Sequence, residues 1–252
     1  MTAEPQHAPS AEAMAAATVD IAAEQAAVVT AAAALTAAEP EAILRWAFDR
    51  YGDRVALASS FGGPSGVVLM ELVQRLQPAT AVFYLDTGYL FPETLATVQA
   101  ARQRWPLARI ERYSSDLSVG QQARLHGEAL WERDSDRCCE IRKLEPNRRA
   151  LAGKRAWIAG LRRDQSVERA QTPAVQWDAK FGLVKVNPLV NWDEQQVWAF
   201  IARHDLPYNP LHDRGFPSIG CTNCTRAVQP GEDPRAGRWS GTDKTECGLH
   251  VP

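Results

Sequence analysis

The fold is decided by residues 55–88, VALASSFGGPSGVVLMELVQRLQPATAVFYLDTG. The apolar run at residues 55–58 has the length of a buried strand, and the Ser and Gly residues of segment 59–63 predict a turn. Residues 65–76 have the length and apolar content of a helix, and a second apolar run follows at residues 81–85. A strand, a helix and a strand at this spacing predict a βαβ unit with parallel strands.

The same alternation continues along the chain and indicates an α/β fold with a mostly parallel, doubly wound sheet. In such folds, ligands bind beyond the carboxyl ends of the strands. Residues 59–63, 86–88 and 160–164 each follow an expected strand, so they are candidates for the binding site. The further expected strands are residues 108–113, 155–159 and 183–186, and the further expected helices are residues 41–51, a segment after Pro92, and residues 193–203.

Composition divides the chain into three segments. Residues 1–40 are biased toward Ala and lack a large apolar stripe, which predicts a disordered or loosely helical extension without catalytic groups. Residues 41–207 carry the strand–helix alternation and are expected to form the α/β domain. Residues 208–252 are rich in Gly, Pro and charged residues, so they are expected to pack as an irregular C-terminal tail over the site.

Composition and charge also exclude several classes of protein. With 45% apolar and 23% charged residues, the chain has the composition of a globular protein. Its formal net charge of −2 argues against a nucleic-acid partner, which would require a broad basic face. No window of about 20 residues is apolar enough to span a membrane. Residues 1–44 contain no Lys or Arg, which fits neither a secretory signal nor a transit peptide, so a cytoplasmic location is expected.

The five cysteines separate into a group of four and a single residue. Cys138 and Cys139 are adjacent, and Cys221 and Cys224 form a Cys-x-x-Cys pair. In a reducing compartment, such a group indicates metal binding rather than disulfides. Adjacent residues of a helix lie about 100° apart around its axis, so their sulfurs reach different irons of a cluster more easily than one tetrahedral ion. The spacing alone leaves a four-thiolate zinc site, and also a set of unrelated buried cysteines, open beside an iron–sulfur cluster.

Cys247 has the surroundings of a reactive thiol. It lies in the polar, glycine-containing segment KTECGLH, residues 244–250. Lys244 and His250 are local candidates to lower the pKa of the thiol, because nearby cations favour the thiolate, which is the species that attacks. A lone cysteine is often a small buried apolar residue, but this setting favours a catalytic nucleophile.

Small residues and pairs of basic residues indicate an anionic ligand. Residues 59–66, SSFGGPSG, join a strand to a helix, where backbone N–H groups can face an anion. The loop lacks the Gly-Lys-Ser/Thr ending of a Walker A motif. Basic pairs are usually solvated surface, but guanidinium groups also suit sulfate and phosphate oxygens. The expected binding residues are Ser60, Gly62, Asp86, Thr87, Lys143, Arg162, Arg163, Arg235, Arg238 and His250.

Six segments together resemble the assimilatory adenylyl-sulfate reductases, the subgroup of the phosphoadenylyl-sulfate reductase family that contains a [4Fe–4S] cluster. The resemblance runs from about residue 41 to residue 250. The matching segments are LDTGYLFPET (85–94), RCCEIRK (137–143), GLRRDQS (160–166), GCTNCT (220–225), GEDPRAGRW (231–239) and ECGLH (246–250).

The resemblance implies a three-layer fold like that of the adenine nucleotide α-hydrolases. It also implies a [4Fe–4S] cluster on Cys138, Cys139, Cys221 and Cys224, with Cys247 as the nucleophile. Cys247 would attack the sulfur of adenylyl sulfate, release AMP and become an S-sulfocysteine. Thioredoxin, or a glutaredoxin-like dithiol protein, would then release sulfite. This reaction belongs to assimilatory sulfate reduction and cysteine biosynthesis.

Other functions share part of this pattern. The nearest is reduction of 3′-phosphoadenylyl sulfate by the same chemistry, although family members that have the four cysteines generally use adenylyl sulfate. A tRNA-thiolating ATP pyrophosphatase usually carries a Ser-Gly-Gly-x-Asp-Ser loop, and residues 60–65 lack the Asp. A zinc-stabilised redox sensor with Cys247 as its switch is the non-enzymatic alternative. The sequence is compatible with a homo-oligomer.

Overall fold

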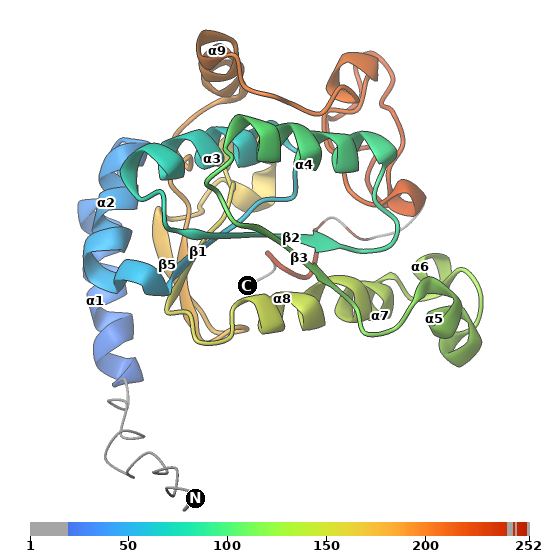
Figure 1. Cartoon of the computed structure of the whole chain (residues 1–252), viewed down its shortest axis with the longest axis horizontal. Coiled ribbons are helices and arrows are strands. Elements are labelled where there is room, and N and C mark those ends of the chain that lie inside the picture. Colours follow the sequence, from blue (N-terminus) through green and yellow to red (C-terminus); the bar gives the residue numbers. More distant parts are fainter. Residues whose placement is uncertain (1–19, 241–243, 245, 251–252) are drawn as a thin grey trace, which may run out of the picture.

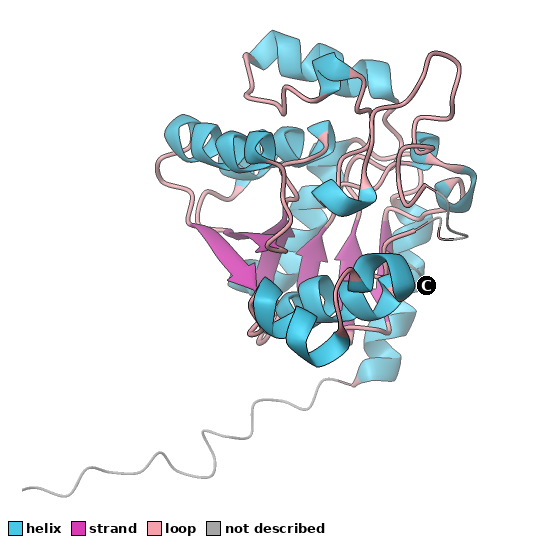
Figure 2. Ribbon diagram, turned by 90° about the vertical axis from the view of Figure 1, so that its right-hand side faces the viewer, coloured by secondary structure: helices cyan, strands magenta, loops and turns pink. Residues whose placement is uncertain are grey.

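A six-stranded sheet forms the centre of the computed structural model, which describes residues 20–240, 244 and 246–250. The strand order is β3-β2-β1-β4-β6-β5, and every neighbouring pair is parallel except β5 with β6. Figure 2 shows the strands side by side with helices in front of and behind them. The strands are β1 (Val55–Ala58), β2 (Ala81–Asp86), β3 (Ile110–Ser114), β4 (Ala156–Ile158), β5 (Val175–Asp178) and β6 (Leu183–Val186).

Helices cover both faces of the sheet, which makes the expected three-layer architecture (Figure 1). On one face, α2, α3 and α4 pack against the strands, and on the other face α8 packs against β2 and β3. The helices are α1 (Ile21–Ala34), α2 (Pro40–Tyr51), α3 (Pro64–Leu76), α4 (Pro92–Arg104), α5 (Val119–His126), α6 (Leu130–Arg133), α7 (Ser135–Cys139), α8 (Glu145–Ala150) and α9 (Glu194–His204).

Alternation of side chains along the strands explains why both faces are covered. In β4, Ala156 and Ile158 join the core under α2, α3 and α4, while Trp157 between them joins the core under α8. In β1, Leu57 likewise joins the core under α2, α3 and α4, and Ala56 joins the core under α8. Full burial of a large apolar side chain contributes about 1.5–3 kcal/mol. A strand that is apolar on both faces is therefore stable only between two layers of helices.

The order of the strands also determines where a ligand can bind. From β1 the chain proceeds outward through β2 to β3, and then returns to place β4 on the other side of β1. The helix that follows β1 (α3) and the helix that precedes β4 (α8) therefore lie on opposite faces of the sheet, and a crevice opens between the carboxyl ends of these two strands. The segments predicted to bind the ligand, residues 59–63 and 160–164, follow these two strands.

Three parts of the fold differ from the expectations. Helices α5 to α8, which lie between β3 and β4, were not among the expected helices. The antiparallel edge strand β5 was missed, because VQWD is short and half polar. The Ala-rich segment is a regular helix over Ile21–Ala34, which packs beside β5 rather than forming a loose extension. Residues 1–19 lie outside the described residues.

A buried carboxylate explains how an Ala-rich helix is fixed to the domain. Glu24 accepts hydrogen bonds from the Tyr51 hydroxyl at 2.5 Å and from Arg155 at 3.0 Å, and it pairs with Arg50 at 3.2 Å. One turn further along the helix, Val28 is buried in the core. The sequence signal was weak because the buried residues of this helix are only one acidic residue, one branched apolar residue and one alanine.

Among the described residues, no helix is both long enough and apolar enough to cross a membrane.

Replacing Glu24 by Ala should lower the free energy of unfolding by about 1–3 kcal/mol, because the buried hydroxyl and guanidinium groups lose their partner. Burial alone would raise the pKa of Glu24, but Tyr51 and Arg50 outweigh it and lower the pKa below the ordinary 4.5. The stabilisation should therefore be complete above pH 4.5 and be lost as the pH falls through the lowered pKa. Urea denaturation at several pH values measures the free energy of unfolding of each variant. The control is Glu39→Ala, which changes an exposed residue. Equal denaturation midpoints for both variants would contradict the prediction.

Candidate active site

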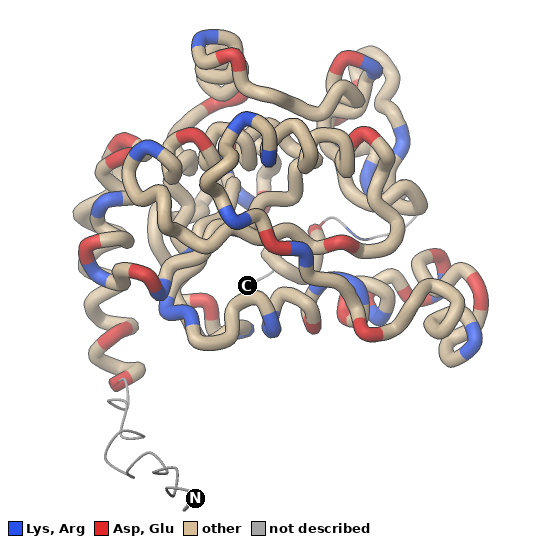
Figure 3. Tube along the Cα trace, in the orientation of Figure 1, with Lys and Arg blue, Asp and Glu red and all other residues tan. Residues whose placement is uncertain are grey.

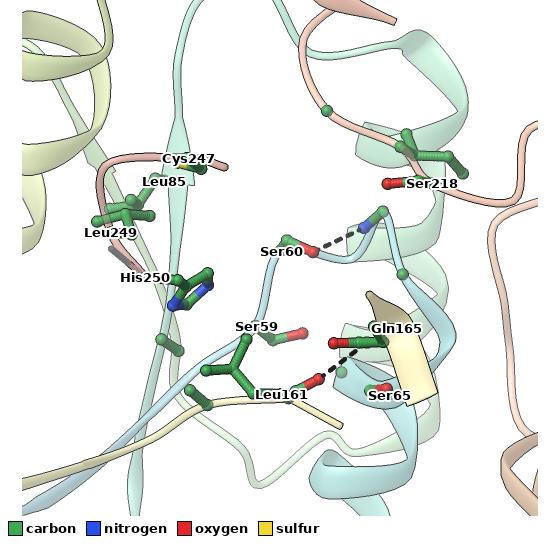
Figure 4. A pocket seen from close by; sticks show the side chains of 18 of the residues that line it. Ser59, Ser60, Ser65, Leu85, Leu161, Gln165, Ser218, Cys247, Leu249 and His250 are labelled. Atoms are coloured by element: carbon green, nitrogen blue, oxygen red, sulfur yellow. Dashed lines mark hydrogen bonds between the residues drawn. The ribbon is translucent and has the colours of Figure 1, made fainter. Parts of the chain in front are cut away.

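A cavity of about 300 Å³ opens at the carboxyl ends of β1, β2 and β4. The strand-end loop Ser59–Gly66 forms one wall, and Cys247, Leu249 and His250 of the tail form the opposite wall (Figure 4). The structure brings most of the predicted site residues to this cavity. They are Ser60, Gly62, Thr87, Lys143, Arg162, Arg235, Arg238, Cys247 and His250.

Two predicted binding residues do not line the cavity. The Asp86 carboxylate accepts a hydrogen bond from the Gly88 backbone N–H at 3.0 Å and pairs with Arg112 at 3.2 Å, so it shapes the turn after β2. Arg163 donates to the Thr172 carbonyl at 2.9 Å and to Asn191 Oδ1 at 2.6 Å. The adjacent Arg162 faces the cavity, because neighbouring residues of an extended segment point to opposite sides.

The strand-end loop has a strained backbone that other segments hold in place. Phe61 has a φ of +52°, a left-handed conformation that is unfavourable for a bulky side chain. Asn209 Nδ2 lies 3.4 Å from the Phe61 carbonyl, and His212 Nε2 lies 2.9 Å from the Gly62 carbonyl. The Ser59 hydroxyl is buried beside the cavity and has no hydrogen-bond partner. Strain held at such a position is typical of a functional loop.

Lys143 is the basic group in contact with the predicted nucleophile. Its Nζ lies 3.8 Å from Cys247 Sγ, and the thiol is only 8% exposed. The pKa of Cys247 is lowered, first by a hydrogen bond from Cys139 and then by the positive charges of Lys143 and Arg238. A metal-bound Cys139 would have no proton to donate, so the charges of Lys143 and Arg238 and the backbone N–H of Leu249 are the causes that would still lower the pKa. The geometry therefore favours a thiolate at Cys247.

Glu246 fixes the nucleophile in the cavity. Its carboxylate accepts a hydrogen bond from Arg169 Nε at 2.7 Å, pairs with Arg235 at 3.2 Å, and accepts the backbone N–H of Cys247 at 2.8 Å. All three charged side chains are largely buried. Arg169, which also lines the cavity, was missed by sequence reasoning because it lies outside the resembling segments. The only sequence feature that pointed to Arg169 as a site residue is its place three positions after the resembling segment 160–166.

The residues after Cys247 lie against the sheet face that α8 covers. Lys185, which is 3% exposed, donates to the Leu249 carbonyl at 3.2 Å, and Lys180 donates to the Gly248 carbonyl. The His250 ring stacks on Trp157, with ring centroids 5.9 Å apart and planes 8° apart. Burial and the surrounding cations lower the pKa of His250, so its imidazole is neutral at pH 7. These contacts make the tail a wall of the cavity.

Two of the predicted binding arginines have closely packed surroundings. Arg162 is 5% exposed, donates to Ser65 Oγ at 2.8 Å and pairs with Asp164 at 2.8 Å, which offsets its charge. Arg238 lies over the Trp239 ring at 4.4 Å, and its buried Nε has no hydrogen-bond partner. A Cβ on Gly220 would lie 2.4 Å from the Arg238 guanidinium, so this position must be glycine for the arginine to reach the cavity.

Charges of both signs alternate over the rest of the molecule (Figure 3). The basic residues of the cavity are therefore a local cluster and not part of a broad basic face. A local cluster of this kind suits a small anion rather than a nucleic-acid backbone.

The helical segment that carries Lys143 also carries two of the predicted metal ligands. Cys138 and Cys139 lie in α7, and residues 140–144 continue as a π-helical turn before α8. In this turn the Glu145 N–H reaches the Glu140 carbonyl, five residues back. Pro146 has no N–H to donate to the carbonyl four residues before it, which disfavours a regular α-helix here. Single π turns of this kind occur often at functional sites.

The four predicted metal ligands line one small cavity beside the larger one. Cys221 and Cys224 lie in a single turn, and Cys221 Sγ is 3.3 Å from Thr87 Oγ1. Burial raises the pKa of Cys138, and it raises the pKa of Cys224 to about 11. Within the described residues, no three His, Cys, Asp or Glu side chains are gathered into a group that could hold a metal ion.

The fold and the cavity define a class: an α/β protein with a nucleotide-type strand-end loop and a buried thiol among cations. The phosphoadenosine phosphosulfate reductase domain matches residues 54–227. A protein of Gloeobacter violaceus named phosphoadenosine 5′-phosphosulfate reductase is 52% identical over 214 residues, which are 84% of this chain and 88% of that protein. An adenosine 5′-phosphosulfate reductase of Salinibacter ruber is 48% identical over 213 residues, which are 84% of each chain.

Solved structures agree with this relationship. The crystal structure of phosphoadenylyl-sulfate reductase from Candida auris, a phosphate complex, has a TM-score of 0.70 and 29% identity, and covers 79% of this chain and 96% of that one. An FMN adenylyltransferase of Candida glabrata, with a TM-score of 0.55 and 15% identity over 83% of this chain and 65% of that one, shares the fold alone. The chain belongs to the phosphoadenosine phosphosulfate reductase family.

Replacing Glu246 by Ala should expose Cys247 and speed its alkylation by iodoacetamide about tenfold or more. The reason is that loss of hydrogen bonds to charged groups costs about 1.5–3 kcal/mol each. Mass spectrometry of the tryptic peptides measures the rate for each cysteine separately. The control is Glu232→Ala, which removes a carboxylate that pairs with Arg226 on the exposed surface of the same tail. Equal rates for Cys247 in both variants would show that Glu246 does not hold the tail.

Proposed function

We propose that the protein reduces adenylyl sulfate to sulfite and AMP, with Cys247 as the nucleophile and a dithiol protein as the reductant. The observation that carries the proposal is the contact of Cys247 Sγ with Lys143 Nζ at 3.8 Å, inside a cavity bounded by the strand-end loop. A lone thiol paired with a buried cation is suited to attack an electrophile that brings negative charge with it.

The substrate would extend across the cavity. The strand-end loop, residues 59–66, begins α3 and offers backbone N–H groups to the nucleotide. At the tail wall, Lys143, Arg235 and Arg238 would receive the phosphate and sulfate oxygens. This arrangement orients the sulfur toward Cys247, and orientation is the main contribution required, because the AMP phosphate is a good leaving group.

In the first step, the Cys247 thiolate attacks the sulfur of adenylyl sulfate. A bond between the two sulfurs forms, and the bond from sulfur to the bridging oxygen breaks with its electron pair passing to the phosphate of AMP. The products are AMP and an S-sulfocysteine at Cys247. Lys143 and Arg238 offset the charge of the sulfate oxygens throughout the step.

In the second step, a thiolate of a dithiol protein attacks Sγ of the S-sulfocysteine. Sulfite leaves with the electron pair of the sulfur–sulfur bond, and a mixed disulfide remains. The second thiol of the reductant resolves that disulfide and restores Cys247, so the reductant supplies both electrons. Because Cys247 is 8% exposed, the tail must move out of the cavity before this step. Thioredoxin, or a glutaredoxin-like protein, is the proposed reductant.

The four thiols that line the smaller cavity have the chemistry of ligands for a [4Fe–4S] cluster, although no three of the described side chains are gathered closely enough to hold a metal ion in this arrangement. The thiols reach this cavity from two distant segments, and Arg142 and Lys143 lie beside them, where their charges would offset a negative cluster. Cys138, Cys139, Cys221 and Cys224 would be the ligands. When bound, the cluster would supply a fixed charge and a structural anchor for the segment that carries Lys143. The proposed reaction needs no electrons from it, because the reductant's thiols supply both.

The choice of adenylyl sulfate over its 3′-phosphorylated form draws on the relatives. The proteins of Salinibacter ruber and Bacillus subtilis, at 48% and 46% identity, are named adenosine 5′-phosphosulfate reductases. The Gloeobacter violaceus relative is named for the phosphorylated nucleotide. Competition between the two nucleotides for the purified enzyme tests the choice, and a preference for the 3′-phosphorylated form would overturn it.

The purified protein should release sulfite from adenylyl sulfate in the presence of reduced thioredoxin, and Cys247→Ser should release none while still binding the nucleotide. The serine hydroxyl is not ionised at neutral pH, so it cannot replace the thiolate. Sulfite formation and calorimetric binding provide the two measurements. Normal turnover by the serine variant would disprove the proposed nucleophile.

Lys143→Ala should lower kcat/KM by roughly 30- to 150-fold, because removal of a positioned charged donor costs about 2–3 kcal/mol of transition-state stabilisation. The matched control is Lys154→Ala. This lysine donates to the Asp53 carbonyl at the amino-terminal ends of β4 and β1, whereas the cavity lies at the carboxyl ends of the strands. A similar kcat/KM for both variants would remove Lys143 from the mechanism.

An anaerobic preparation should contain about four irons per chain, as expected for a [4Fe–4S] cluster. Cys221→Ser should lose most of that iron and its brown absorbance. Metal analysis by mass spectrometry measures both, and one zinc per chain in place of iron would favour the zinc-stabilised redox sensor instead.

A further inference from the structure

The amide of Asn147 is a buried polar group in the lining of the cavity. Asn147 is 1% exposed and lines the cavity, yet neither its Nδ2 nor its Oδ1 has a hydrogen-bond partner. An unpaired buried amide costs about 1–3 kcal/mol, so such groups are rare unless a ligand completes them. Nothing in the resembling segments or in the mechanism above accounts for this amide.

The position of Asn147 indicates which part of a ligand it would meet. It follows Lys143 by four residues on one continuous helical segment, so the two side chains lie on the same side of it. Lys143 in turn contacts Cys247. Asn147 is therefore beside the end of the cavity where the attacked sulfur must lie. The strand-end loop is attached to α3, on the opposite face of the sheet.

His250 presents a similar unpaired group from the tail. Its Nδ1 is buried and has no hydrogen-bond partner, and the ring lines the same cavity. Figure 4 shows this ring beside Leu249 and Cys247, opposite the strand-end loop. Two separate segments, α8 and the tail, thus each bring a polar side chain with unpartnered atoms to the cavity that contains the nucleophile.

We propose that Asn147 is a further substrate-binding residue, whose Nδ2 donates a hydrogen bond to an oxygen of the sulfate group. This inference rests on the proposed function and adds a neutral donor to the cations that surround the sulfate. Sulfate oxygens only accept hydrogen bonds, so the donor end of the amide faces them. The contact distinguishes the sulfated nucleotide from AMP, which has no group at that position.

Calorimetric titration with adenylyl sulfate and with AMP tests the inference in a Cys247→Ser background, where no turnover occurs. Adding Asn147→Leu should weaken adenylyl sulfate about tenfold, because a hydrogen bond to a charged group contributes about 1.5–3 kcal/mol, while AMP should change less than twofold. Asn147→Asp should weaken adenylyl sulfate at least as strongly, since a carboxylate repels the sulfate. Gln103→Leu, at an exposed amide of α4 outside the cavity, is the matched control.

The outcomes separate the possibilities. An equal loss for both nucleotides would mean that Asn147 contacts adenosine or supports the fold, and an unchanged affinity for adenylyl sulfate would mean that the amide is not a ligand; either result overturns the inference. Retained AMP binding shows that each variant is folded. If the Cys247→Ser parent binds AMP but not adenylyl sulfate, the proposed function fails and this inference fails with it.

Discussion

The carboxylate of Glu246 is the group on which the arrangement of the site depends. It lies between the guanidinium groups of Arg169 and Arg235 and also accepts the backbone N–H of Cys247. Like charges confined to a poorly solvated cavity repel one another, so these arginines need an anion between them. By supplying that anion from the residue before the nucleophile, the chain couples the position of the thiol to the basic residues of the substrate cavity.

The same coupling extends to the segment that carries Lys143. The π-helical turn between α7 and α8 lets one continuous stretch present cysteines to the small cavity and Lys143 to the large one. Lys143, which lines both cavities, therefore places the small cavity next to the charge that contacts Cys247. This proximity gives a physical reason for a structural and electrostatic role of a bound cluster, without electron transfer through it.

The basic residues of the site differ in how their charge is already balanced. Arg162 is paired with Asp164 and donates to Ser65, so it fixes the start of α3 while facing the cavity. Arg238 retains a buried donor, its Nε, without a hydrogen-bond partner. The amide of Asn147 and Nδ1 of His250 are also buried without partners, and both side chains are neutral. The unsatisfied donors and acceptors lie on the walls of a cavity whose proposed ligand is an anhydride rich in acceptor oxygens.

The sequence by itself determined the five parallel strands of the described residues, their alternation with α3 and α4, the strand-end position of the site and the division of the cysteines into four and one. These depend on local periodicity and on residue types that carry their chemistry wherever they fold. Only the tertiary structure decided that Glu246 meets Arg169, that Asn147 lines the cavity, and that Glu24 fixes the Ala-rich helix. It also decided that Arg162 lines the cavity, whereas the adjacent Arg163 points away from it and donates to the Thr172 carbonyl. These outcomes depend on contacts between residues far apart in the chain, which local sequence patterns do not encode.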